Sequence, residues 1–172
     1  MKNGRRATLL HAGVLAGVGL AGAVRPAWAQ ESDRTRIVGT WSLVEMTLQQ
    51  GGNRIEPFGP APRGLMVMTA DGYFTTNLMR ASLPKFASNN RMTGTVEENQ
   101  AAVRGVLSFF GTYRMDEAAK TVHLRIIGSS YPNWDGTDQP RGYSFEGDTL
   151  IYDSPAGTSG PGVPRIVWRR AG

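Results

Sequence analysis

Three side chains that are distant in the sequence, His123, Tyr113 and Arg141, could together carry out acid–base chemistry. His123 is the only histidine after residue 29, and imidazole ordinarily titrates near neutral pH. A tyrosine facing it in a cavity could exchange protons with an enolisable or carbonyl ligand, and Arg141 could hold a carboxylate or stabilise an oxyanion. The alternative is a buried His–Tyr hydrogen bond with the arginine salt-bridged at a rim. We rank structure or plain ligand contact above catalysis.

This arrangement depends on the register of one hairpin. If Met115 pairs with Thr121 across a five-residue turn, Tyr113 lies opposite His123 and the two share a face of the sheet. A shift of one residue would place Tyr113 opposite Leu124 instead. The candidate acid–base pair therefore exists in only one of two closely related registers.

A second candidate site is the loop segment Tyr131-Pro132-Asn133-Trp134. Aromatic side chains around a proline, at the mouth of a sheet, could form a lid or a wall on which a ligand stacks. Trp134 could equally tuck beneath the rim and complete the core. The residues leave both interpretations open.

Metal and cofactor chemistry finds no support in the residue types. The chain contains no cysteine, which excludes thiol catalysis, thiolate-bound zinc and iron–sulfur clusters. A single histidine after residue 29 excludes a multi-histidine metal site. The sequence has no phosphate-binding loop, nucleophile elbow or dinucleotide fingerprint. We therefore expect neither a metal nor a cofactor.

The elements that would position these residues are mostly strands. Gly39 lets backbone pass closely, and Trp41, on the same strand, could plug one end of a closed sheet. Hairpin turns are predicted at Asp71-Gly72, where Ala70 would pair with Tyr73, and at Gly147-Asp148. Eight short strands are expected, at residues 37–48, 64–70, 73–79, 109–115, 121–127, 141–146, 149–154 and 165–170.

One helix interrupts this pattern. Thr95 and Glu98 have the spacing of a capping box, which predicts a helix from there to about Leu107, between the third and fourth expected strands. Short strands with regular turn signals indicate an all-β fold, an antiparallel sandwich or barrel.

Residues 1–29 have the features of a cleaved export signal. A basic start is followed by the Gly- and Ala-rich apolar stretch 9–24 and by the A-x-A cleavage site Ala27-Trp28-Ala29. Arg5-Arg6 resembles a twin-arginine signal, and the general secretory route stays equally open. The expected organisation is a signal at 1–29 and one domain at 30–172, so the protein would be periplasmic or secreted.

Signal removal changes the charge of the chain. The four basic residues of the segment reduce the Lys and Arg total from 19 to 15, against 14 acidic residues, so the net charge falls from +5 to +1. No basic block remains, which argues against nucleic acid or a membrane surface as partners. We expect no stable membrane insertion after cleavage, and the oligomeric state stays open.

Several short motifs make the chain resemble the bacterial lipocalin-like domain proteins, which are small β-barrels. The resemblance covers about residues 36–170 and rests on Gly39-x-Trp41, Asp71-Gly72-Tyr73, Gly111-x-Tyr113, His123, Tyr131-Pro132-Asn133-Trp134-x-Gly136, Gln139-x-Arg141 and Gly147-Asp148-x-Leu150. It implies an eight-stranded antiparallel up-and-down barrel with a ligand-sized interior and a helix beside it. It implies no general reaction. Met68 departs from the pattern, because the family often has an aromatic residue there.

The resemblance also implies roles for individual residues. In such barrels an arginine near the last strand covers the tryptophan at the closed end, a cation–π contact worth about 0.5–2 kcal/mol. The structural residues would be Gly39, Trp41 and either Arg169 or Arg170. The residues expected to bind a ligand are Tyr73, Tyr113, His123, Asn133, Trp134 and Arg141.

The leading hypothesis is an exported barrel that binds a small, largely apolar or weakly anionic molecule in its interior. One alternative is a cofactor-free isomerase, cyclase or hydrolase that uses His123, Tyr113 and Arg141. Another is a structural protein whose barrel is filled by its own side chains. An open cavity of a few hundred Å³ reaching His123 would favour the first two, and a filled interior the third.

Overall fold

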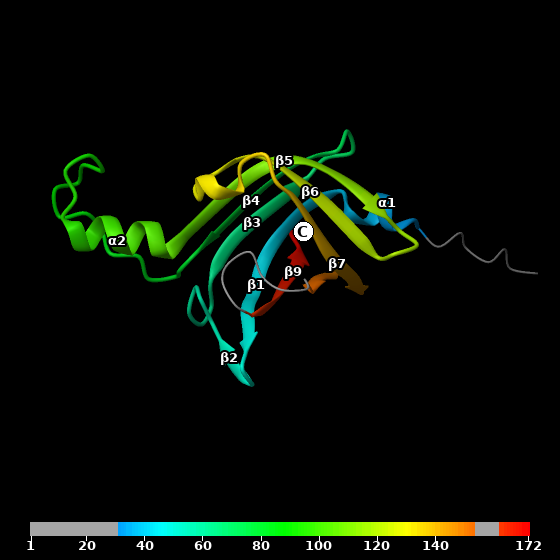
Figure 1. Cartoon of the computed structure of the whole chain (residues 1–172), viewed down its shortest axis with the longest axis horizontal. Coiled ribbons are helices and arrows are strands. Elements are labelled where there is room, and N and C mark those ends of the chain that lie inside the picture. Colours follow the sequence, from blue (N-terminus) through cyan, green and yellow to red (C-terminus); the bar gives the residue numbers. More distant parts are fainter. Residues whose placement is uncertain (1–30, 154–161) are drawn as a thin grey trace, which may run out of the picture. The chain divides into compact units, whose positions relative to one another are not determined.

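In the computed structural model, which describes residues 31–153 and 162–172, the chain forms a closed antiparallel barrel (Figure 1). The barrel closes because β1 (Gly39–Gln50) pairs with β9 (Val163–Arg170) as well as with β3 (Arg63–Met68). The remaining barrel strands follow in chain order: β4 (Tyr73–Met79), β5 (Val106–Asp116), β6 (Thr121–Ser129), β7 (Asp138–Glu146) and β8 (Thr149–Asp153). Closure leaves these eight strands without a free edge, as expected for a barrel rather than a sandwich.

A short extra strand, β2 (Asn53–Ile55), pairs only with the end of β1. The helix α2 (Val96–Gly105) follows β4, the fourth strand in chain order, so its predicted position between the third and fourth strands is not confirmed. The capping box that predicted the helix is present, because the Thr95 hydroxyl accepts from the Glu98 N–H and the Glu98 carboxylate accepts from the Thr95 N–H. Two other short helices were not predicted: α1 (Asp33–Ile37) and the 3₁₀ turn η1 (Pro132–Trp134). The predicted start of the first strand at Ile37 is wrong, because Ile37 ends α1 and β1 begins at Gly39.

Alternate residues of each strand point into the barrel. Met66 and Met68 on β3 and Phe74, Thr76 and Leu78 on β4 are all buried, whereas Tyr73 and Thr75 are exposed. On β1 the alternation shifts between Leu43 and Glu45, where a bulge disturbs the pairing with β9. This bulge allows Trp41 and Met46, an odd and an even position of the same strand, both to reach the interior.

The predicted register of the β3–β4 hairpin is wrong by one residue. Met68 pairs with Phe74, not with Thr75, because the turn contains three residues between Thr69 and Tyr73 rather than two. Gly72 has a φ of 88°, as is typical of the last residue in a three-residue hairpin loop. In the observed register Tyr73 lies on the outer face of the barrel, and not on the inner face with Met66 and Met68. The β7–β8 hairpin, in contrast, has the predicted two-residue turn, with Glu146 opposite Thr149.

The helix α1 closes one end of the barrel. Ile37 is fully buried, and its carbonyl accepts a 2.9 Å hydrogen bond from the Trp41 indole N–H. Arg170 covers the Trp41 ring, with the guanidinium carbon 4.2 Å from the ring centroid, and donates to the Val38 carbonyl. A Cβ on Gly39 would lie only 2.5 Å from Arg170 Nη1, so this glycine makes room for the covering arginine.

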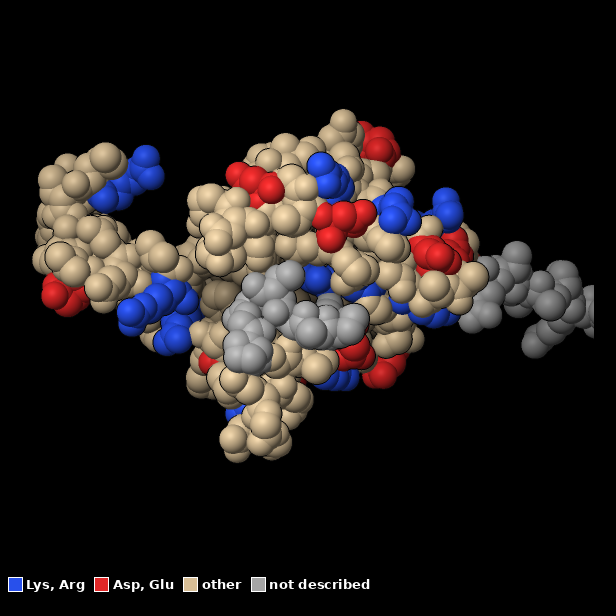
Figure 2. Space-filling view, in the orientation of Figure 1, with Lys and Arg blue, Asp and Glu red and all other residues tan. Residues whose placement is uncertain are grey.

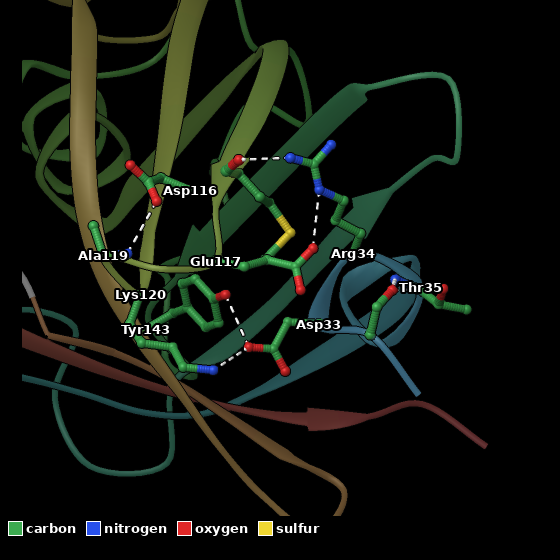
Figure 3. A network of polar contacts seen from close by, with 10 residues as sticks. Asp33, Arg34, Thr35, Asp116, Glu117, Ala119, Lys120 and Tyr143 are labelled. Atoms are coloured by element: carbon green, nitrogen blue, oxygen red, sulfur yellow. Dashed lines mark hydrogen bonds and ion pairs between the residues drawn. The ribbon is translucent and has the colours of Figure 1, made fainter. Parts of the chain in front are cut away.

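Ion pairs hold α1 against the barrel (Figure 3). Asp33 accepts from the Lys120 ammonium at 2.6 Å and from the Tyr143 hydroxyl at 2.9 Å, and Arg34 pairs with Glu117 at 2.9 Å. Burial alone would raise the pKa of Asp33, but the hydrogen bonds from Lys120 and Tyr143 and the nearby positive charges hold that pKa below its ordinary value. Both the packing of Ile37 and the ion pairs of Asp33 and Arg34 therefore hold α1 against this end of the barrel.

On the face shown in Figure 2, both Lys or Arg and Asp or Glu side chains are visible on the described residues. No helix within the described residues is long and apolar enough to span a membrane. The predicted export signal at 1–29 lies outside the described residues, as does Ser154, the last residue of the predicted strand 149–154.

Candidate functional site

The barrel interior contains a cavity of about 30 Å³. Apolar side chains from β1, β3, β4, β5, β6 and β9 form most of its wall, together with Trp134. Three polar side chains join them: Thr76, Arg141 and Tyr152. A volume of this size has room for one or two water molecules and not for a benzene ring, which needs about 150 Å³. The interior is therefore nearly filled in this state of the protein.

Two polar atoms in the cavity wall stand out. Thr76 Oγ1 and Trp168 Nε1 are buried and have no hydrogen-bond partner among the residues that the structure describes. Their side chains are 2% and 1% exposed, and both line the same cavity from different strands, β4 and β9. Buried polar groups without a partner are rare in native proteins and are unfavourable for folding, so both atoms require an explanation.

Arg141 brings a buried positive charge to the same cavity. It projects inward from β7, donates to the Gln139 side-chain carbonyl and to the Pro140 backbone carbonyl, and is 9% exposed. Burial lowers the pKa of its guanidinium below the usual value, and neighbouring Tyr152 partly offsets this. Tyr152 donates to the Met68 sulfur at 3.4 Å, and burial raises its pKa. Arg141 thus lies in the cavity wall, with Gln139, Pro140 and Tyr152 as its neighbours.

A groove of about 430 Å³ lies beside this cavity. Val103 and Arg104 of α2, Phe58, and Tyr131 of the loop before η1 contribute to its wall. The groove and the interior cavity share three lining residues, Met46, Leu107 and Trp134. These shared side chains separate the interior cavity from the groove. The helix α2, which borders the groove, lies at the other end of the view from α1 (Figure 1).

Trp134 is the largest side chain of this partition. It is buried, and its ring packs edge-on against Phe109 at 5.3 Å and against Tyr131 at 6.0 Å between centroids. Its position comes from η1, whose N-terminal Pro132 suits the first turn of a helix. Of the two interpretations of the loop that the sequence left open, the structure shows Trp134 tucked under the rim, where it also borders the groove.

A chain of hydrogen bonds joins the Trp134 loop to Arg141. The Thr137 hydroxyl donates to the Trp134 carbonyl at 2.6 Å, and the Gln139 amide donates to that hydroxyl at 3.1 Å. Gln139 then accepts from Arg141. These bonds connect Arg141 in the barrel interior to the segment that carries Trp134.

The predicted His123–Tyr113 pair does not form. Arg114 pairs with His123 and Tyr113 with Leu124, because Asp116 rather than Met115 pairs with Thr121. His123 points outward, with Nδ1 2.9 Å from Arg114 and 3.7 Å from Asp138. The structure thus has the alternative register and places the two side chains on opposite faces of the sheet.

The other predicted ligand residues are scattered. Tyr73 is exposed on the outer face, and Asn133 is exposed in η1. Tyr113 points inward near the α1 end, where its hydroxyl donates to the Thr69 carbonyl at 2.7 Å; burial and the charge of Asp71 raise its pKa. Of the six predicted residues, the structure brings only Trp134 and Arg141 to the interior cavity.

A larger groove of about 790 Å³ lies at the α1 end, beside Tyr113 and Arg34. Its polar side chains already have protein partners: Arg34 contacts Glu117, and Tyr113 contacts Thr69. We therefore place the candidate site at the other end. No cluster of three or more metal-ligating side chains occurs within residues 31–153 and 162–172.

Sequence reasoning missed Thr76, Tyr152 and Trp168. Thr76 was on the correct strand, but the misplaced hairpin turn left its face undecided. Trp168 lies two residues before Arg170 and therefore faces the same side of β9. Because Arg170 was a candidate to cover Trp41, the sequence could have predicted that Trp168 faces the same way as Arg170. Tyr152 carries no comparable signal, because both faces of β8 are buried at Leu150, Ile151 and Tyr152.

Comparison with known proteins gives two findings. The family described as "Lipocalin-like domain" matches residues 38–171 of this chain. The chain is also similar to "4'-hydroxy-3'-methoxypropiophenone carrier protein ppsC" of Aspergillus oryzae (strain ATCC 42149 / RIB 40), with 34% identity over 82 residues. That alignment covers 44% of this chain and 74% of the relative.

Proposed function

The chain belongs to the lipocalin-like domain family, and we propose that it binds a small, largely apolar molecule inside its barrel. The relative from Aspergillus oryzae is named as a carrier protein, which supports binding and release rather than chemical turnover. A carrier needs an apolar interior and a route to the surface. The end of the barrel opposite α1 offers both.

One observation carries this proposal: the interior cavity and the surface groove share Met46, Leu107 and Trp134 as a common wall. An outward movement of Trp134 would merge the two spaces without breaking a strand pairing, because η1 lies outside the barrel strands. The merged space would accommodate a drug-sized ligand. Met46 and Met66, which both line the interior cavity, can adapt their shape to an occupant.

The enzyme alternative loses its geometric basis. Its three residues do not meet, because His123 faces outward, Tyr113 lies near the α1 end, and only Arg141 lines the interior cavity. The alternative of a barrel filled by its own side chains gains support from the small size of the cavity. We prefer the binding function, because a self-filled core has no need of two buried polar atoms that lack a partner among the described residues.

Mass spectrometry of the protein purified from its native compartment tests the proposal. The native protein should carry a small molecule that is released on unfolding. Leu107→Trp enlarges a side chain of the shared wall. This variant should carry less of the small molecule than the wild type, provided that circular dichroism shows a folded barrel. Wild-type protein that carries no small molecule, and that binds none from an extract of the same compartment, would contradict the proposal.

We also propose that the protein is exported. The basic start and the A-x-A site at residues 27–29 support cleavage after Ala29. Such a cut would leave Ser32, whose hydroxyl caps α1, in the mature chain. Mass analysis of exported protein should show Gln30 as the first residue, and a chain that retains residues 1–29 would contradict this. Undiminished export after replacement of Arg5 and Arg6 by lysine would exclude the twin-arginine route.

A further inference from the structure

We propose that the ligand is an aromatic compound that carries a hydrogen-bond-accepting oxygen, such as a ketone or an ether, and that Trp168 and Thr76 bind this oxygen. The inference rests on the proposed function, because it describes what the barrel interior selects. It starts from the two unpartnered atoms, Trp168 Nε1 and Thr76 Oγ1, in the wall of one cavity.

The chemistry of these two groups defines the polar part of the ligand. The indole N–H of Trp168 can only donate, so its partner must be an acceptor. The Thr76 hydroxyl, in the wall of the same cavity, can rotate to donate to an acceptor there. In the unliganded protein a water molecule has room in the cavity of about 30 Å³ and could occupy this position. A ligand that displaces such a water keeps its affinity only if it supplies an oxygen of its own.

The surrounding rings define the apolar part. Phe109 packs edge-on against Trp134, with centroids 5.3 Å apart, and against Phe74 at 5.9 Å. Phe109, Trp134 and Trp168 line the cavity together. A flat aromatic ligand could make further edge-to-face contacts with these rings, each worth about 0.5–1.5 kcal/mol beyond the area that it buries.

The expected stability of the unliganded protein also fits this inference. An unpartnered hydroxyl in an apolar wall lowers stability, and a methyl group of the same shape would be neutral or better. Sites that sacrifice stability in this way are typical of binding function. Thr76→Val should therefore change stability and affinity in opposite directions, which a residue with only a packing role would not do.

The test measures the affinity of two probes of similar shape, propiophenone and propylbenzene, by calorimetry. Only the ketone offers an acceptor, so wild-type protein should bind propiophenone at least tenfold more tightly than propylbenzene. Thr76→Val should reduce propiophenone affinity about tenfold, the loss of one hydrogen bond, and leave propylbenzene affinity unchanged. Its melting temperature should equal or exceed that of the wild type.

The matched control is Thr75→Val, the same change on the adjacent, exposed residue of β4. It should leave both affinities unchanged. Trp168→Phe should reduce the preference for the ketone in the same way, and it provides a second test if Thr76→Val does not fold.

Equal binding of the two probes by the wild type would overturn this inference and leave the proposed function standing. An unchanged preference for the ketone in both Thr76→Val and Trp168→Phe would also overturn it. Failure of the wild type to bind either probe would overturn this inference, whereas the proposed function would still be decided by the small molecule that the purified protein carries.

Discussion

The ring of Trp134 meets the ring of Phe109 edge-on, with an angle of 82° between their planes and 5.3 Å between their centroids. Phe109 belongs to the barrel wall, whereas Trp134 belongs to a loop that leaves the barrel after β6. This contact therefore joins a barrel strand, β5, to a segment outside the barrel strands, η1. It lies where the interior cavity and the open groove share a wall.

Trp134→Ala should open the interior to the groove and accelerate ligand association. Loss of a buried aromatic side chain typically costs about 3–5 kcal/mol of stability, and we expect the lower end, because Trp134 lies at the rim. Stopped-flow binding of an apolar fluorescent probe would measure the rate. Trp134→Phe, which keeps a ring at this position, should show a smaller change. An association rate equal to that of the wild type would show that Trp134 does not limit entry.

The closed end should depend on Trp41 and on one arginine of the last strand. Trp41→Ala should destabilise the protein by about 3–5 kcal/mol. Arg170→Met should cost less, about 0.5–2 kcal/mol, because it removes a cation–π contact and leaves the ring buried. Arg169→Met is the matched control, since Arg169 is exposed and should barely affect unfolding by urea. Equal effects of the two arginine changes would refute the assignment of Arg170 as the covering residue.

The ion pair of Asp33 should make the closed end sensitive to acid. The folded-state pKa of Asp33 lies below its ordinary value of 3.8, so its contribution to stability is complete above that pH and is lost as pH falls through the lower folded-state pKa. Asp33→Asn should lower the melting temperature at pH 7, and the difference from the wild type should narrow below about pH 3.8. Glu31→Gln, a change at an exposed carboxylate nearby, should have little effect at either pH. A difference that stays constant down to pH 2 would contradict this assignment.

Ligand binding should not depend on His123. Its ring lies on the outer face beside Arg114 and Asp138, so His123→Ala should leave the affinity for an interior ligand unchanged. Arg141→Met, which removes the buried charge at the cavity, should change that affinity. Calorimetric titration of both variants with one probe would measure the contrast. A strong loss of binding in His123→Ala alone would revive the catalytic interpretation.

The sequence predicted the strands of this fold better than it predicted which way their side chains point. Turn signals at Asp71-Gly72 and Gly147-Asp148 are equally clear, yet the first belongs to a three-residue loop and the second to a two-residue loop. Thr69 makes the difference, because its hydroxyl and backbone bond to Tyr73 and lengthen the first turn. One residue in a turn reverses the facing of a whole strand.

The same limit explains the candidate site. The sequence indicated Trp134 and Arg141 from the resemblance, and both line the interior cavity. The acid–base pair failed because the β5–β6 turn is one residue shorter than expected. The bulge in β1 carries no sequence signal of its own, so the inward position of Met46 was not predictable from alternation along that strand.

The most direct test of the central claim follows the indole N–H signals by ¹H–¹⁵N NMR during titration with propiophenone. The chain has four tryptophans, and Trp→Phe variants would assign their signals. If the ligand enters the barrel past the rim, the signals of Trp168 and Trp134 should shift together and saturate. The signal of Trp41, whose N–H bonds to the Ile37 carbonyl at the closed end, should not move. A saturating titration that leaves Trp168 unchanged would show that the ligand binds outside the barrel and would contradict the account.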